Sequence, residues 1–193
     1  MERPVLIIGN RNYSSWSLRA WLALDATGQS FDEVMVPLGQ PDTTDEILRW
    51  SPTARVPAYR HREIVMWDSL AICEHLAETN PEAGLWPADP RARAAARSVV
   101  AEMHSGFAAL RGECPMNCGL RVRLDRIGTA LDKDIRRIDE IWTEGLVSHG
   151  GPWLAGPNFS AVDAFYAPVA FRIQTFALPL GTRALEYAAR IRQ

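Results

Sequence analysis

The first eighty residues alternate between short apolar runs and helix-like patterns. The apolar run PVLIIG, residues 4–9, predicts a buried strand, and a helical pattern follows from Ser14 to about Thr27. Residues 31–37, FDEVMVP, alternate imperfectly between apolar and polar positions and predict a second strand. A strand, a helix and a strand in so short a stretch form a βαβ unit, whose strands run parallel. The apolar stripe of the helix is expected at Leu18, Trp21, Leu22 and either Leu24 or Asp25.

The pattern then continues with shorter elements. Residues 43–50 predict a short helix that ends before Pro52, and residues 57–60 and 63–67 predict two strands of a hairpin. The stretch DSLAICEHLAE predicts a helix for which Asp68 is the candidate N-cap. The predicted order of the first part is therefore β-α-β-α-β-β-α.

A change of pattern divides the chain. Residues 80–90, NPEAGLWPADP, are rich in proline and glycine and predict a linker. No strand alternation follows it, so we expect an α/β domain at 1–79, the linker at 80–90 and an all-α helical domain at 91–193. The helices of the second domain are predicted at 91–110, 124–148, 160–176 and 182–192, the third of them opened by a capping pattern at Ser160 and Asp163.

Composition narrows the class of protein. A chain that is 47% hydrophobic and 23% charged is typical of a soluble globular protein, and a net charge of −2 argues against a nucleic-acid partner. Without an apolar leader or a run of about twenty apolar residues, we expect a cytoplasmic protein that does not enter a membrane. Three cysteines at Cys73, Cys114 and Cys118 make neither a disulfide framework nor a zinc-ligand spacing, so we expect free thiols and no metal.

A cluster of hydroxyl groups precedes the first helix. NYSSWSLR places Ser14, Ser15 and Ser17 around its first turn. A serine there either caps the helix by accepting a hydrogen bond from an unpaired amide or presents its hydroxyl to a ligand. The spacing alone favours the cap.

Four motifs in order along the chain resemble those of the glutathione transferase family. SSWSLR resembles the Ser-Ser-Cys motif of the zeta class, with Trp16 in place of the cysteine. VPAY resembles the Val-Pro that opens the third strand with a cis peptide bond, and DSLAICEHL and GPNFSAVDAF resemble the openings of the third helix and of a helix in the helical domain. The resemblance, to a zeta- or theta-like serine class, covers nearly the whole chain. It implies a thioredoxin-like N-terminal domain followed by an all-α C-terminal domain.

The resemblance also implies a site for glutathione, as co-substrate. Ser14 is the expected donor to the thiol, with Ser15 and then Ser17 as alternatives and Tyr13 as a rival, since other classes use tyrosine. A free thiol has a pKa near 8.5, and lowering it by two units requires about 2.7 kcal/mol. The peptide would be held by Val56 and Pro57 through the backbone, by Asp68 at the ammonium and by Ser69 at the carboxylate.

A second substrate is expected near Trp16 and the first long helix of the second domain. There Met103, Phe107 and Arg111 recur every four residues and line one stripe, although Met103 and Phe107 fit a buried core equally well. The cations available for a dicarboxylate are Arg19, Arg111 and Arg172.

The resemblance implies an enzyme of detoxification that activates glutathione as a thiolate for attack on small apolar electrophiles or hydroperoxides. The alternatives are a glutathione-dependent cis-trans isomerase of a small dicarboxylate, similar to maleylacetoacetate isomerase, and a non-catalytic binding module. The resemblance further implies a homodimer. Trp16 in place of cysteine weighs against the isomerase, and the retained Ser14, Pro57, Asp68 and Ser69 weigh against the module.

Overall fold

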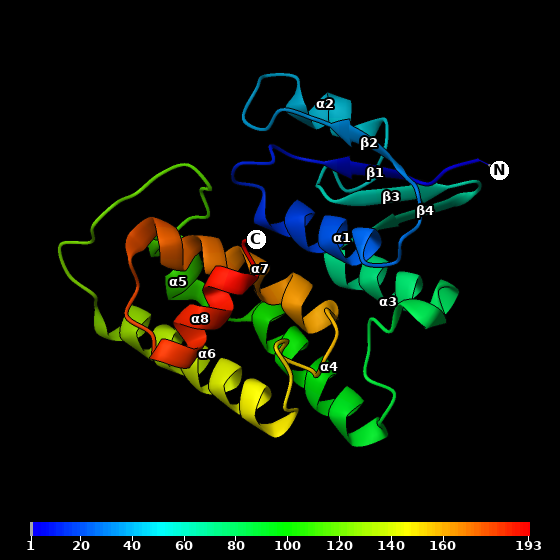
Figure 1. Ribbon diagram of the computed structural model, residues 1–193. Coiled ribbons are helices and arrows are strands. Elements are labelled where there is room, and N and C mark those ends of the chain that lie inside the picture. The colour runs from blue at the N-terminus through cyan, green and yellow to red at the C-terminus, as the bar shows by residue number, and fades with distance from the viewer. Residues whose placement is uncertain (1) are drawn as a thin grey trace. The chain divides into compact units, whose positions relative to one another are not determined.

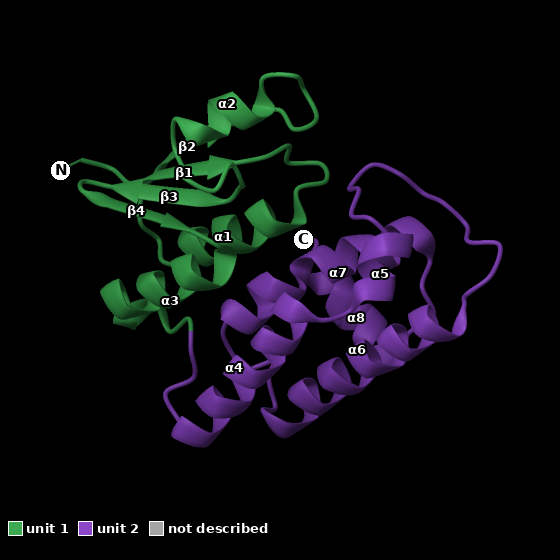
Figure 2. Ribbon diagram, turned by 180° about the vertical axis from the view of Figure 1, so that it is seen from behind, with its two compact units in different colours: residues 1–85 green, residues 86–193 purple. Residues whose placement is uncertain are grey.

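The computed structural model describes residues 2–193, which form two compact units. One unit reaches to Leu85 and the other spans Trp86–Gln193 (Figure 2). Within residues 2–193 no helix is long and apolar enough to cross a membrane.

The first unit has the predicted order of elements. These are β1 (Val5–Ile8), α1 (Ser15–Asp25), β2 (Asp32–Met35), α2 (Thr43–Leu48), β3 (Ala58–His61), β4 (Ile64–Trp67) and α3 (Ser69–Thr79), followed by a short 3-10 turn, η1 (Pro81–Ala83). The strands form one sheet in the order β2-β1-β3-β4. β1 runs parallel to β2, whereas β3 is antiparallel to both β1 and β4. The predicted parallel βαβ unit and the hairpin are confirmed.

Helices cover both faces of this sheet. Figure 1 shows α1 and α3 on one face and α2 on the other. Successive side chains of a strand point to opposite faces. Accordingly Ile7 packs with Ile47 in the core beneath α2, and its neighbours Leu6 and Ile8 are buried on the opposite face. The apolar run of β1 is therefore explained by a central strand covered on both sides.

The buried face of α1 differs from the predicted stripe. Leu24 is buried as predicted, but Leu18, Trp21 and Leu22 are only partly buried. The helix contacts α3 and the sheet, and its buried positions include small residues that allow close approach of the backbones. The buried residues of α1 are Ser15, Ser17, Arg19, Ala20, Ala23 and Leu24.

The second unit contains helices only. They are α4 (Pro90–Ser105), α5 (Ala108–Glu113), α6 (Thr129–Ser148), α7 (Ala161–Phe176) and α8 (Thr182–Arg190). Helix α7 is buried along most of its length and packs on α4 and α8, so it is the centre of this unit. Together with the sheet of the first unit, these helices confirm the predicted fold class.

Two predicted helix bounds were wrong. The helix predicted over 91–110 is divided at Gly106 and Phe107, where Phe107 has a left-handed φ of 58°. The guanidinium of Arg111 donates to the carbonyl oxygens of Gly106 and Met103 and so satisfies the broken end of α4. The helix predicted from Leu124 begins only at Thr129.

The capping pattern at the start of α7 is confirmed. Asp163 is 0% exposed, and its carboxylate accepts hydrogen bonds from the backbone N–H of Ser160 at 2.9 Å and of Leu154 at 3.0 Å. It also accepts from the hydroxyls of Ser160 and Tyr187, each at 2.8 Å. This carboxylate therefore joins the loop before α7 to α8.

Candidate functional site

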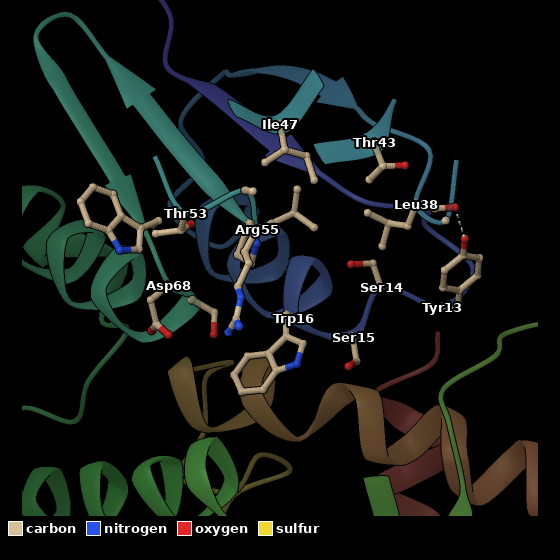
Figure 3. A pocket seen from close by; sticks show the side chains of 16 residues that line it. Tyr13, Ser14, Ser15, Trp16, Leu38, Thr43, Ile47, Thr53, Arg55 and Asp68 are labelled. Carbon is tan, nitrogen blue, oxygen red and sulfur yellow. Dashed lines mark hydrogen bonds between the residues drawn. The ribbon is translucent and has the colours of Figure 1, made fainter. Parts of the chain in front are cut away.

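A cavity of about 950 Å³ opens in the first unit, where the N-termini of α1 and α3 meet the turn before β3 (Figure 3). Trp16 lines it, together with most of the residues predicted from the sequence to act on the thiol or to hold glutathione, whereas Ser17, an alternative thiol donor, lines a separate cavity. Their placement in one cavity is a finding, whereas their roles stay predictions. Those residues are Ser14, Ser15, Val56, Pro57, Asp68 and Ser69.

Ser14 stands at the N-cap position of α1 but does not cap it. Within residues 2–193 its side chain accepts no hydrogen bond from the first turn. Its Oγ instead donates to Oγ of Ser17 at 2.8 Å, and Oγ of Ser17 accepts from the backbone N–H of Gly9 at 3.0 Å. Helix capping, which the spacing favoured, therefore does not explain Ser14, and Figure 3 shows its hydroxyl directed into the cavity.

Tyr13, the rival donor, is engaged elsewhere. Its hydroxyl lies 2.8 Å from Oδ1 of Asn10 and 3.4 Å from the carbonyl oxygen of Leu38, the contact drawn in Figure 3. A phenol has one proton to donate, and these two acceptors use it. Ser14 and Ser15, both 8% exposed, are the next hydroxyls of this segment at the cavity wall.

The turn before β3 supplies a second wall. The Val56–Pro57 peptide bond is cis, as the resemblance implied. The β3–β4 ladder begins with the pair Ala58–Trp67, so Val56 lies just outside it and presents its backbone to the cavity. Arg55 also lines the cavity, and Figure 3 shows its side chain extending between Asp68 and Trp16. Arg55 was not predicted from the sequence, although a cation directly before the Val-Pro motif was the available signal.

The N-terminus of α3 supplies the third wall. Asp68 caps the helix by accepting from the backbone N–H of Leu70 at 2.8 Å, and its φ of 75° is rare for a residue other than glycine. Ser69 follows as the first residue of the helix and is 0% exposed. Its Oγ has no hydrogen-bond partner among residues 2–193. A buried hydroxyl without a partner is unfavourable by about 1–3 kcal/mol, so this position favours a polar ligand.

A buried cation lies beneath the site. Arg19 is 0% exposed, and its guanidinium stacks on the ring of Trp16 with 4.3 Å between the guanidinium carbon and the ring centroid. Trp16 therefore forms a fixed apolar wall, and the charge behind it adds positive potential near the N-terminus of α1.

The other residues predicted for a second substrate lie in the helical unit. Met103 is 1% exposed and Phe107 is 7% exposed, so both contribute to the core of that unit, the alternative that their spacing left open. Arg111 binds the carbonyls at the end of α4, and burial lowers its pKa. Its backbone contacts give Arg111 a structural task in addition to the role predicted for it.

The cysteines of the chain are poor nucleophiles. Burial, together with the nearby charge of Glu74, raises the pKa of Cys73 to about 12. Burial likewise raises the pKa of Cys114 to about 11 and raises that of Cys118. Burial therefore disfavours the thiolate form of all three cysteines.

Residues 13–79 match the family model described as glutathione S-transferase, N-terminal domain. The first unit therefore carries a glutathione S-transferase N-terminal domain. The chain as a whole is similar to the maleylacetoacetate isomerase of Rattus norvegicus, at 28% identity over 92% of this chain and 82% of the relative. It is also similar to a zeta-class glutathione S-transferase of Euphorbia esula, at 28% identity over 86% of this chain and 75% of the relative.

Solved structures support the fold of the chain. A glutathione transferase homolog from Burkholderia GL BGR1, with bound glutathione, superposes with a TM-score of 0.73 at 24% identity, covering 98% of this chain and 91% of the other. A theta-class glutathione S-transferase from Xanthomonas axonopodis pv. citri, also with glutathione bound, gives a TM-score of 0.71 at 21% identity. The superposition covers 100% of this chain and 93% of the other. The predicted resemblance to glutathione transferases and the predicted fold are confirmed.

Proposed function

We propose that this protein is a glutathione transferase, which binds glutathione in the cavity of the first unit and holds its sulfur as a thiolate beside Ser14. The observation that carries the proposal is the buried hydroxyl of Ser69, which has no partner among residues 2–193 and lines the same cavity as Ser14. The similar structures with bound glutathione and the curated relatives that are glutathione-dependent by name support it.

Each charged group of glutathione has a complement in this cavity. The α-carboxylate of the γ-glutamyl end takes the unpaired amides at the N-terminus of α3 and the hydroxyl of Ser69. Asp68 takes the ammonium beside it, and the guanidinium of Arg55 takes the glycyl carboxylate. The backbone of Val56 pairs with the cysteinyl residue in the manner of an added strand.

These contacts direct the sulfur toward the N-terminus of α1. There Ser14 donates a hydrogen bond to the thiolate, and the helix dipole favours the same negative charge. Ser15 is the second hydroxyl within this wall. Trp16 offers an apolar surface beside the sulfur, which suits small apolar electrophiles or hydroperoxides.

The proposal is tested by retention of the protein on immobilised glutathione and by conjugation of an aryl halide. We expect both retention and conjugation, with conjugation dependent on Ser14. A protein that neither binds the matrix nor lowers the pKa of the glutathione thiol would contradict the proposal.

A second function is favoured by a different observation, a buried cation in the helical unit. Arg172 is 4% exposed, its Nε donates to the carbonyl oxygen of Cys114 at 2.8 Å, and burial and the charge of Arg111 lower its pKa to about 10. A carboxylate substrate would stabilise this guanidinium, and relatives named maleylacetoacetate isomerase are consistent with such a substrate. Rapid isomerisation of maleylacetone with negligible conjugation, lost in Arg172→Ala, would establish this second function in place of the first.

A further inference from the structure

Ser17 stands behind Ser14 rather than in the main cavity. It is 3% exposed and lines a separate cavity of about 300 Å³, between the end of β1 and the outer side of α1. Ser14 lines both cavities. The two hydroxyls, 2.8 Å apart, therefore form the wall between this smaller cavity and the proposed glutathione site.

The hydrogen bonds of this pair leave one proton unused. A serine hydroxyl donates one hydrogen bond and accepts two. Oγ of Ser17 accepts from Gly9 N–H and from the hydroxyl of Ser14, so both of its lone pairs are engaged. Its own proton has no acceptor among residues 2–193, which is an unfavourable state for a buried donor.

A thiolate beside Ser14 would resolve this mismatch. The proton of Ser14 would turn to the sulfur, and the proton of Ser17 would then turn to Oγ of Ser14. The chain would run from Gly9 N–H to Ser17, from Ser17 to Ser14 and from Ser14 to the sulfur, with every donor used. Hydrogen bonds aligned in this way polarise one another and strengthen the last donor.

We propose that Ser17 is a positioning residue that holds Ser14 through Gly9 and increases the strength of its hydrogen bond to the thiolate. The inference rests on the proposed function, because it concerns how Ser14 acts on bound glutathione. No covalent bond changes in this step, and only the two hydroxyl protons reorient.

Close approach at Gly9 makes the arrangement specific. A Cβ at this position would lie 3.0 Å from Oγ of Ser14 and 2.6 Å from Cδ1 of Leu38. The absence of a side chain therefore lets the end of β1 come near enough for its N–H to reach Ser17. Ser17 thus bonds to a strand eight residues earlier rather than to a carbonyl of its own helix.

The test measures the pKa of the glutathione thiol in the complex, and the titration is monitored by the ultraviolet absorbance of the thiolate. We expect Ser17→Ala to raise this pKa by about half a unit to one unit and to change KM for glutathione less than about twofold. We expect Ser17→Thr to behave as the wild type, because it keeps the hydroxyl and its methyl group has room in the adjoining cavity. Thr27→Val is the matched control, because it removes a hydrogen-bonded hydroxyl at the far end of α1.

A double-mutant cycle separates this role from simple support of the fold. If Ser17 acts through Ser14, then Ser14→Ala and Ser14→Ala/Ser17→Ala have the same thiol pKa. If Ser17→Ala does not fold, Ser17→Cys keeps the side-chain position with a weak donor, and the same rise in pKa is expected.

An unchanged thiol pKa in Ser17→Ala, together with a raised one in Ser14→Ala, would overturn this inference and leave the proposed function standing. A further rise in pKa when Ser17 is removed from Ser14→Ala would also overturn it. A wild-type complex whose thiol titrates as it does in free solution would refute the proposed function itself.

Discussion

Replacing Ser14 with alanine removes a hydroxyl of the cavity wall that is hydrogen-bonded to Ser17. A hydrogen bond to a charged group contributes roughly 1.5–3 kcal/mol, and 1.4 kcal/mol corresponds to a factor of ten. We therefore expect turnover at neutral pH to fall about 10- to 100-fold. The half-saturation for glutathione should change little, because the walls formed by Val56, Asp68 and Ser69 hold the peptide.

The pH profile makes this expectation sharper. The thiol pKa is lowered in the wild-type complex and returns toward about 8.5 in Ser14→Ala. The deficit of Ser14→Ala relative to the wild type is therefore fully present below the lower pKa and shrinks between the two values. Above the higher pKa the thiol ionises without help, and the two proteins converge. Steady-state kinetics with an aryl halide, measured across the titration of the thiol with Thr27→Val as control, test this. Full activity in Ser14→Ala with a loss in Ser15→Ala or Tyr13→Phe would refute the assignment.

Three further predictions follow from other parts of the molecule. Asp68→Ala and Ser69→Ala should each raise the half-saturation for glutathione about tenfold or more with a smaller effect on turnover, since these contacts are the same before and during reaction; unchanged half-saturation in both would remove that role. Asp163→Ala should lower the free energy of unfolding, measured in urea, by about 3–5 kcal/mol, because it leaves buried donors unpaired. The control Asp139→Ala removes a single exposed hydrogen bond to the Gly181 amide and should lower the free energy of unfolding by less than about 1 kcal/mol. Equal effects of the two substitutions would contradict the reasoning. Sedimentation should show a homodimer at micromolar concentration, and a stable monomer of 21.5 kDa would contradict it.

The elements of the first unit were predictable because large apolar residues and turn residues mark them. PVLIIG reads as a buried strand, and β1 is buried on both faces. The buried face of α1 was not predictable in the same way, because Ala20 and Ala23 pack there while larger neighbours stay partly exposed. Periodicity counts bulky side chains and overlooks contacts made by small ones.

In the second unit, the position of a helix break depends on a contact that the sequence pattern does not indicate. Nothing in the spacing of Met103, Phe107 and Arg111 reveals that the helix is divided at Phe107. The break is stabilised by the guanidinium of Arg111 on carbonyls of the preceding turn, a contact that only the folded chain specifies.

The candidate site was predictable in its motifs but not in its hydrogen bonds. Ser14, Val56, Pro57 and Ser69 share a cavity, as the resemblance implied. The bond of Ser14 to Ser17 joins helix α1 to the end of strand β1 through Gly9, and no local pattern indicates it.

The raised pKa values of the cysteines bear on which thiol, that of the protein or that of its ligand, reacts with electrophiles. Burial disfavours the thiolate form of Cys73, Cys114 and Cys118. Under the proposed function, the protein stabilises the sulfur anion of a ligand while burial keeps its own thiols protonated. If the proposed function holds, its nucleophile arrives and leaves with the ligand, so oxidants and alkylating agents would consume a replaceable peptide and spare the polypeptide that activates it.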